Sequence, residues 1–260
     1  MTSDAKSGES YKPVKSILIS QPKPKGTRNS FFALEDKFDI KIDWRQFIHV
    51  EPVTEKEFRK NRLRPDDFSA VIFTSRQSID HFFRMCEEMR VKMSAETKYF
   101  CISKAVANYL QKFIIYRKRK VFVGKKVIED LTPAINKHKD NLKFLLPCSN
   151  LGATQIVEYL KELKIDFQDV MMYRTLMSDL SDLENVTYDI LVFFSPLGID
   201  SLYQNFPDFK QKDTRIAVFG NQTCDALNER GLVANIKAPS KETPSMTMAL
   251  ENYLKLANGK

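Results

Sequence analysis

Short apolar runs alternate with longer segments of helical period along most of this 260-residue chain. The apolar runs lie at residues 17–20, 71–74, 99–102, 121–123, 144–146, 190–194, 216–219 and 233–236. The helical segments follow them at 27–37, 75–89, 104–112, 127–137, 150–163, 196–205, 221–230 and 243–257. This alternation is typical of parallel sheets with right-handed crossovers, and fully apolar strands indicate helices on both sheet faces. The sequence therefore predicts an α/β fold.

Several strand-helix segments of the first half have similar counterparts in the second half. VIFTSRQSIDHFF (71–83) matches LVFFSPLGIDSLY (191–203), and YFCISKAVANYL (99–110) resembles IAVFGNQTCDAL (216–227). KFDI (37–40) and KIDF (164–167) each follow a strand-helix unit. A repeat of this length predicts two related flavodoxin-like parallel-sheet domains, with a substrate cleft between them.

Polar residues follow the predicted strands where parallel sheets bind ligands, at the strands' carboxyl ends. Exposed helix N-termini bind anions there through free N–H groups, although the same serines are also ordinary helix caps. The candidate anion-binding residues are Thr74, Ser75, Arg76, Ser103, Lys104, Ser195, Pro196, Gly220, Asn221 and Thr223.

Composition narrows the function classes. A net charge of +8 indicates either a solvated basic surface, as we read the cluster at 117–126, or attraction to a polyanion.

The sequence has no G-x-G-x-x-G, P-loop or G-x-S-x-G motif. Its scattered cysteines predict neither a zinc site nor disulfides, and they favour a reducing cytoplasm. Residues 1–13 lack an apolar signal segment and predict a frayed tail. We read His81 and His138 as helix-surface residues and His49 as a strand residue.

The order of these segments carries a resemblance. LLPCSNLGATQIVEYLKELKIDFQDVMMYRT is followed by FFSP, by FGNQTCDALNERGL and by an Ala-Pro-Ser-x-x-Thr-Pro segment. From Val14 onward the chain resembles the uroporphyrinogen-III synthase family, chiefly through Tyr173-Arg174-Thr175, Phe194-Ser195-Pro196 and Gly220-x-x-Thr223. Two departures stand out: Cys148-Ser149-Asn150 replaces a common arginine-glycine pair, and the first half lacks a Gly-x-x-Thr.

The resemblance implies a discontinuous first domain, 1–44 with 177–260, and a second domain, 45–176, joined by two linker strands near 38–50 and 166–175. It implies cyclisation of hydroxymethylbilane, a linear tetrapyrrole with eight carboxylates, to uroporphyrinogen III with inversion of ring D and loss of water. No cofactor and no metal are expected. Tyr173 is the expected proton donor, with its hydroxyl facing the cleft instead of either core, and Arg174 joins the substrate-binding candidates. A cytoplasmic monomer without membrane or nucleic-acid partners is expected.

Other interpretations remain open from sequence alone. The chain could be a non-catalytic two-domain binding protein for a polyanionic small molecule such as a tetrapyrrole, or a degenerate synthase that binds without turnover. A basic nucleic-acid binder would need aromatic and basic residues interleaved on one face, and the sequence shows none.

Overall fold

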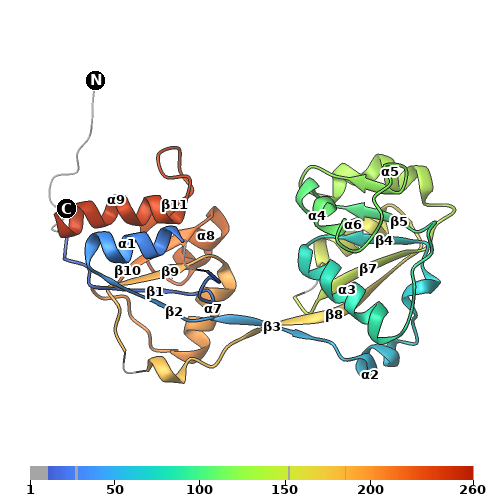
Figure 1. Ribbon diagram of the computed structural model, residues 1–260. Helices are drawn as coiled ribbons and strands as arrows, with labels where there is room; N and C mark the ends of the chain where they lie inside the picture. The colour runs from blue at the N-terminus through green and yellow to red at the C-terminus, as the bar shows by residue number, and fades with distance from the viewer. Residues whose placement is uncertain (1–10, 27–28, 152, 185, 260) are drawn as a thin grey trace. The chain divides into compact units, whose positions relative to one another are not determined.

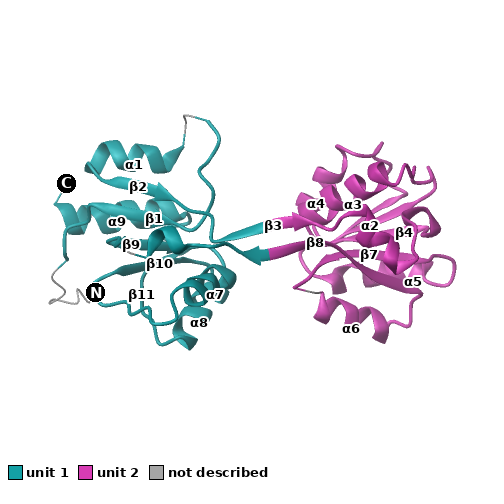
Figure 2. Cartoon of the chain, turned by 90° about the horizontal axis from the view of Figure 1, so that it is seen from below, with its two compact units in different colours: residues 1–49, 176–260 teal, residues 50–175 magenta. Residues whose placement is uncertain are grey.

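The computed structural model describes residues 11–26, 29–151, 153–184 and 186–259 (Figure 1). Contacts divide the chain into two compact units, residues 1–49 with 176–260 and residues 50–175, which Figure 2 colours separately. The chain enters unit 2 within β3 (Ile48–Pro52) and returns within β8 (Phe167–Met177). The sequence-based domain limits remain a prediction. Most of the predicted tail, and residues 27–28 of the first predicted helix, lie outside the described residues.

The described part of unit 1 contains a five-stranded sheet of order β11-β10-β9-β1-β2, in which all neighbours pair in parallel. Its strands are β1 (Ser16–Ile19), β2 (Lys41–Trp44), β9 (Ile190–Phe193), β10 (Arg215–Phe219) and β11 (Ala234–Ala238). Its α-helices are α1 (Ser30–Phe38), α7 (Pro196–Asn205), α8 (Asn221–Glu229) and α9 (Met246–Asn258). Numbered along the chain, the strands run 2-1-3-4-5, the flavodoxin order.

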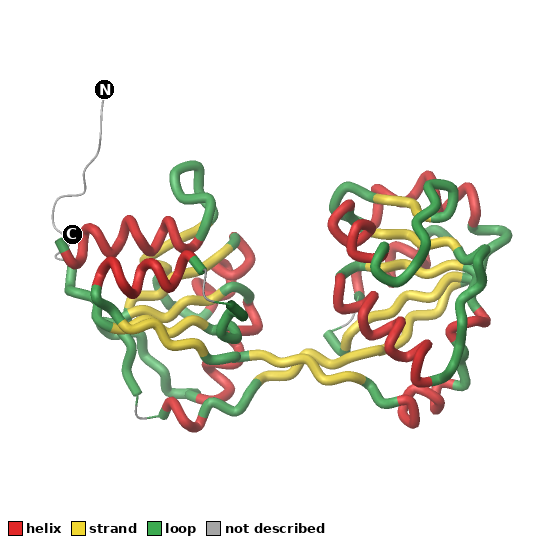
Figure 3. Tube along the Cα trace, in the orientation of Figure 1, coloured by secondary structure: helices red, strands yellow, loops and turns green. Residues whose placement is uncertain are grey.

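Helices cover both faces of this sheet because its strands are apolar on both sides. Ile17 and Ile19 pack with residues of α1 and α9, whereas Leu18 between them packs with residues of α7 and α8. Unit 1 is therefore a three-layer α/β/α domain (Figure 3).

Unit 2 contributes the strands of a second sheet, with the order β3-β8-β7-β4-β5-β6 among the described residues. The other strands are β4 (Ala70–Phe73), β5 (Lys98–Cys101), β6 (Val121–Val123) and β7 (Phe144–Ser149). The α-helices are α2 (Glu55–Phe58), α3 (Arg76–Glu88), α4 (Lys104–Leu110), α5 (Thr132–His138) and α6 (Thr154–Glu162). From β8 to β6 the strands pair in parallel.

The two sheets have the same strand order if β7 and β8 stand for β1 and β2. β4 and β9 then occupy the same place, as do β5 and β10. These are the strands whose sequences match, so the predicted α/β class with two related parallel-sheet domains is confirmed.

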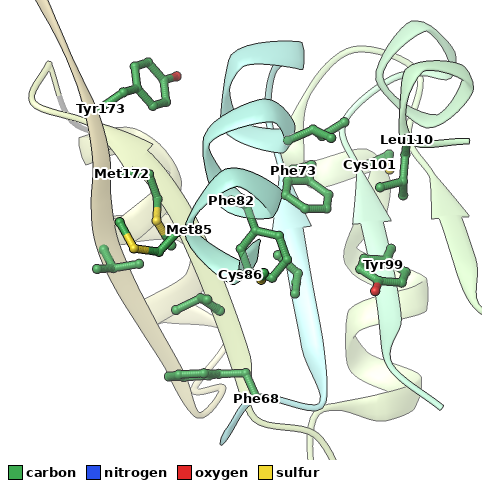
Figure 4. Packing of buried hydrophobic residues seen from close by; sticks show 14 of the residues in the cluster. Phe68, Phe73, Phe82, Met85, Cys86, Tyr99, Cys101, Leu110, Met172 and Tyr173 are labelled. Atoms are coloured by element: carbon green, nitrogen blue, oxygen red, sulfur yellow. The ribbon is translucent and has the colours of Figure 1, made fainter. Parts of the chain in front are cut away.

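Unit 2 packs two apolar clusters against opposite faces of its sheet. Phe73 and Phe82 meet edge-on in one cluster, with ring centroids 5.4 Å apart (Figure 4). Phe100 and Phe144 belong to the other cluster, which α5 and α6 cover. All four rings are fully buried. Truncating such a ring to alanine costs about 3–5 kcal/mol, so these clusters contribute much of the stability of unit 2.

Several helix starts differ from the sequence prediction. The predicted helix 127–137 is a 3₁₀ turn over Ile128–Leu131 followed by α5, because Pro133 has no N–H to continue the earlier turn. The helix predicted from residue 150 begins at Thr154, since Asn150 bonds to Thr175 instead. The last helix begins after Ser245, which caps the N–H of Met248.

Candidate active site

Strand pairing brings the candidate residues of unit 2 to one edge of its sheet. Phe73 pairs with Cys101, and Ser149 pairs with Tyr173. The residues that follow β4 and β5 therefore lie at the same edge as Tyr173. This is the carboxyl end of the parallel strands, and β7 and β4 form the switch point at which such sheets bind ligands.

Ser75 caps helix α3 at this edge. Its Oγ accepts from the N–H of Ser78 at 3.0 Å, and Ser78 Oγ donates back to the Ser75 carbonyl at 2.8 Å. Ser75 Oγ also lies 3.4 Å from the Tyr173 hydroxyl. Capping is thus confirmed for Ser75, and the same oxygen contacts the predicted proton donor.

Tyr173 is more buried than the sequence suggested. The residue is 6% exposed and belongs to the core cluster of unit 2, whereas its hydroxyl was expected to face the cleft and not a core; the orientation of that hydroxyl toward a cleft stays a prediction. In Figure 4 it lies at one edge of the cluster, away from Phe68 and Cys86. Burial raises the pKa of the phenol, although its bond to Ser75 acts in the opposite direction. The hydroxyl therefore stays protonated at neutral pH and is able to donate.

His81 holds the other side of the Tyr173 ring. The two rings stack with centroids 4.8 Å apart and planes 17° apart. Nδ1 of His81 is buried and has no hydrogen-bond partner among the described residues. Burial, with help from Arg84, lowers the pKa of this imidazole, which favours the neutral ring at pH 7. The sequence reading of His81 as a helix-surface residue is only partly right: it is half-buried in α3, and the Tyr173 ring, 92 positions away in the sequence, covers its imidazole.

Arg174, next to Tyr173 in the sequence, is paired with Glu57. Its guanidinium forms a two-pronged ion pair with Glu57 of α2, one bond from Nη1 measuring 3.2 Å and a shorter one coming from Nη2. Hydrogen bonding to Arg174 lowers the pKa of Glu57. A substrate carboxylate would have to compete with Glu57 for this cation.

The remaining candidates of unit 2 divide into capping and exposed groups. Ser103 caps α4 through the N–H of Val106 at 3.4 Å, and Thr74 is half-buried. Lys104 is exposed, with no ion pair among the described residues. Arg76 is exposed too, and its guanidinium lies over the Tyr109 ring, 5.5 Å from the ring centre.

In unit 1 the equivalent of Ser75 behaves differently. Ser195 precedes α7 and Pro196 occupies the first turn, but the Ser195 side chain makes no capping bond, so the capping interpretation is wrong here. Gly198 packs closely against Phe193 and lies near this hydroxyl. A Cβ at Gly198 would lie 3.9 Å from Ser195 Oγ, 3.7 Å from Ser20 Oγ and 3.2 Å from the Phe193 ring. Ser20 and Ser195 follow β1 and β9, the switch point of this sheet.

Helix α8 begins directly after a glycine. Gly220 precedes α8 with φ of +87°, a conformation that side chains rarely adopt. Its N–H donates to the Ala238 carbonyl at 2.7 Å, and Asn221 beside it is exposed. Thr223 is 2% exposed and lies inside α8, so its methyl and hydroxyl are mostly covered.

Asn150 is a residue whose role the sequence did not show. Its Oδ1 accepts from the Thr175 N–H at 2.7 Å, and its Nδ2 donates to the Thr175 carbonyl at 3.2 Å. This side chain fixes the backbone two residues beyond Tyr173. Glu57 was missed as well, since nothing in the sequence pairs it with Arg174.

No group of three or more potential metal ligands occurs among the described residues, and no helix among them is long and apolar enough to span a bilayer. Two pockets of about 670 and 560 Å³ lie elsewhere, lined mostly by residues that precede the strands. The candidate groups lie at the carboxyl ends of the two sheets, and they include hydroxyls, helix N-termini and cations suited to binding several anionic groups.

The family model described as uroporphyrinogen-III synthase HemD matches residues 46–248. The chain belongs to the uroporphyrinogen-III synthase family. A search of curated proteins found no matching sequence.

Solved uroporphyrinogen-III synthases share the fold. A mutant enzyme from the extremely thermophilic bacterium Thermus thermophilus superposes with a TM-score of 0.61 at 14% identity, covering 95% of this chain and 100% of its own. The enzyme from Helicobacter pylori gives 0.58 at 18% identity, covering 93% and 99%. At these identities the structures show a common fold and leave the roles of individual residues to be argued from this chain.

Proposed function

We propose that this chain is a cofactor-independent uroporphyrinogen-III synthase. The match of the family's model to residues 46–248 carries the proposal. The reaction closes hydroxymethylbilane into uroporphyrinogen III, inverts ring D and releases one water.

The reaction requires one proton for the leaving hydroxyl and close control of the substrate's conformation. Protonation lets the terminal hydroxyl leave as water, and the substituted carbon of ring D attacks the resulting azafulvene cation to give a spiro intermediate. Fragmentation and re-closure invert the ring, and loss of a proton from carbon restores the balance. Holding the reacting carbons close is worth far more than any single acid, because orientation removes several kcal/mol from such a barrier.

Carboxylates of the substrate are the handles for this positioning. The chain carries a net charge of +8, and α3, α7 and α8 each begin at the carboxyl end of a sheet, where helix N-termini attract anions. Thr74, Arg76, Lys104 and Asn221 add polar or charged side chains that are exposed or half-buried. We propose that these groups, with Ser103, Pro196, Gly220 and Thr223 shaping the backbone around them, bind the carboxylates.

Tyr173 is the proposed proton donor. A phenol is protonated at neutral pH and so has a proton to give, and the Ser75 hydroxyl, 3.4 Å away, could pass a proton to it or orient its O–H. His81 contributes by holding the ring.

The setting follows from the same proposal. We propose a monomer that acts in the cytoplasm on a free tetrapyrrole, without a nucleic-acid partner. Analytical ultracentrifugation of the purified chain checks the oligomeric state.

Incubation with freshly made hydroxymethylbilane tests the function. Isomer III as the main product supports the proposal. Binding of a tetrapyrrole with only isomer I formed would instead favour the non-catalytic binding protein.

A further inference from the structure

A pocket of about 670 Å³ opens on unit 2, remote from Tyr173. It is bounded by the end of α3, by residues 92–97 ahead of β5 and by residues 113–120 ahead of β6. These segments precede the strands, whereas the candidate active site follows them. The volume lies within the range of about 300–1,000 Å³ that is usual for small-molecule sites.

The walls are apolar and already formed. Phe83 and Phe113 stack with ring centroids 4.8 Å apart and planes 10° apart. Thr97 N–H donates to the Ser94 carbonyl at 3.0 Å. The Lys120 ammonium donates to the Ala95 carbonyl and to Glu96, which ties the 92–97 segment to β6. A ligand would therefore meet little ordering cost.

The lining has an excess of positive charge. Arg90, Lys92 and Arg117 line the pocket with no ion pair among the described residues, and Glu87 is its one acidic lining residue among them. A similar pocket in unit 1, about 560 Å³, balances Lys210 and Lys212 against Glu184 and Asp208. Of these two pockets, the one on unit 2 is the more cationic.

Two side chains of the pocket are incompletely packed or bonded: one is a hydroxyl without a hydrogen bond among the described residues, and the other is an exposed apolar side chain. Thr97 is 2% exposed, and its Oγ1 has no hydrogen-bond partner among the described residues. Ile115 is 83% exposed at the rim. The exposed branched side chain at the rim fits a missing apolar occupant, whereas the covered Thr97 Oγ1 could bond to an occupant only after its neighbours move.

We propose that this pocket binds a flat apolar acid, independently of the synthase reaction. Its apolar body would lie against Phe83, Phe113 and Met93, and its carboxylate, sulfonate or phosphate would face Arg90, Lys92 and Arg117. Apolar walls with a few convergent cations select this class of ligand.

Titration of the full chain with anilinonaphthalene sulfonate, a flat aromatic sulfonate, tests the proposal by fluorescence. We expect a saturable site that Arg117→Glu weakens at least about tenfold, a change of about 1.4 kcal/mol. The matched control is Lys118→Glu, an exposed neighbour outside the pocket, which should change affinity less than about twofold. The backbone turn at Arg117 uses only its carbonyl, so the fold should survive, as circular dichroism checks.

A second pair of variants probes the apolar side. Ile115→Asn should weaken the dye about threefold or more, whereas Val233→Asn, exposed on unit 1, should not. Three results would overturn the proposal. Both glutamate variants could weaken dye binding equally, all four variants could leave it unchanged, or the binding could fail to saturate. None of these results depends on synthase activity.

Discussion

The imidazole of His81 stacks on the phenol of Tyr173, with ring centroids 4.8 Å apart. The contact joins the second turn of α3 to β8, and Ser75 at the start of the same helix meets the phenol's hydroxyl at 3.4 Å. One helix therefore fixes both the ring and the O–H of the proposed proton donor.

His81→Phe should preserve this stack and remove a buried nitrogen that has no partner among the described residues. We expect the free energy of unfolding at pH 7.5 to be unchanged or to rise by about 1 kcal/mol. The lowered pKa of His81 means that the unfolded chain binds the proton more readily. Native stability should then fall as pH drops below about 6.5, the ordinary histidine pKa, and His81→Phe should reduce that fall.

Urea unfolding at pH 7.5 and 5.5 compares the two proteins, with His81→Ala as the variant that loses the stack. An equal loss of stability on acidification in native protein and His81→Phe would exclude His81 as the titrating group.

Tyr173→Phe should slow turnover while keeping the ring, its packing and the fold. A general acid is typically worth about 10² to 10⁴ in rate, and we expect a loss towards the lower end, because positioning of the tetrapyrrole does not depend on this phenol. The loss should appear in kcat with little change in KM. Steady-state kinetics with a normal isomer ratio and full rate would remove Tyr173 from the mechanism.

Ser75 and Ser195 form a matched pair at equivalent strand ends. Ser75→Ala should cost about 1 kcal/mol of stability, because its hydroxyl caps α3. Ser195→Ala should cost less than about 0.5 kcal/mol, because its hydroxyl makes no capping bond. If Ser195 binds a substrate carboxylate, its loss should raise KM severalfold. Unchanged KM in Ser195→Ala would leave that hydroxyl without a role in binding.

Substitutions at Arg174 and Glu57 test whether the Arg174 guanidinium binds the substrate or only stabilises the fold through its ion pair. Arg174→Gln should raise KM if the guanidinium binds a carboxylate, whereas Glu57→Gln should lower KM or leave it unchanged by releasing the cation. Both variants should lose about the same small amount of stability. Identical kinetic effects of the two substitutions would mean that the pair serves the fold alone.

Much of the architecture was predictable from residue patterns. Strands such as Ala70–Phe73 and Ile190–Phe193 are apolar on both faces, and their repeated sequences predicted two related sheets. Helix starts were less predictable, because they depend on contacts made elsewhere. Asn150, for example, bonds to Thr175 and delays the start of α6.

The candidate site was predictable only in part. The serines after the strands were visible because a parallel sheet collects its carboxyl ends at one edge. The stack of His81 on Tyr173 and the pairing of Arg174 with Glu57 join residues 92 and 117 positions apart. Such partners depend on sheet register and helix rotation, which a single sequence does not specify.

The isomer composition of the product tests the central claim most directly. Freshly made hydroxymethylbilane is incubated with the chain, with heat-inactivated chain and with buffer, and the oxidised porphyrins are separated by isomer. We expect mainly isomer III with the active chain and mainly isomer I in both controls. Isomer I alone, formed with the chain at the rate seen in buffer, would contradict it.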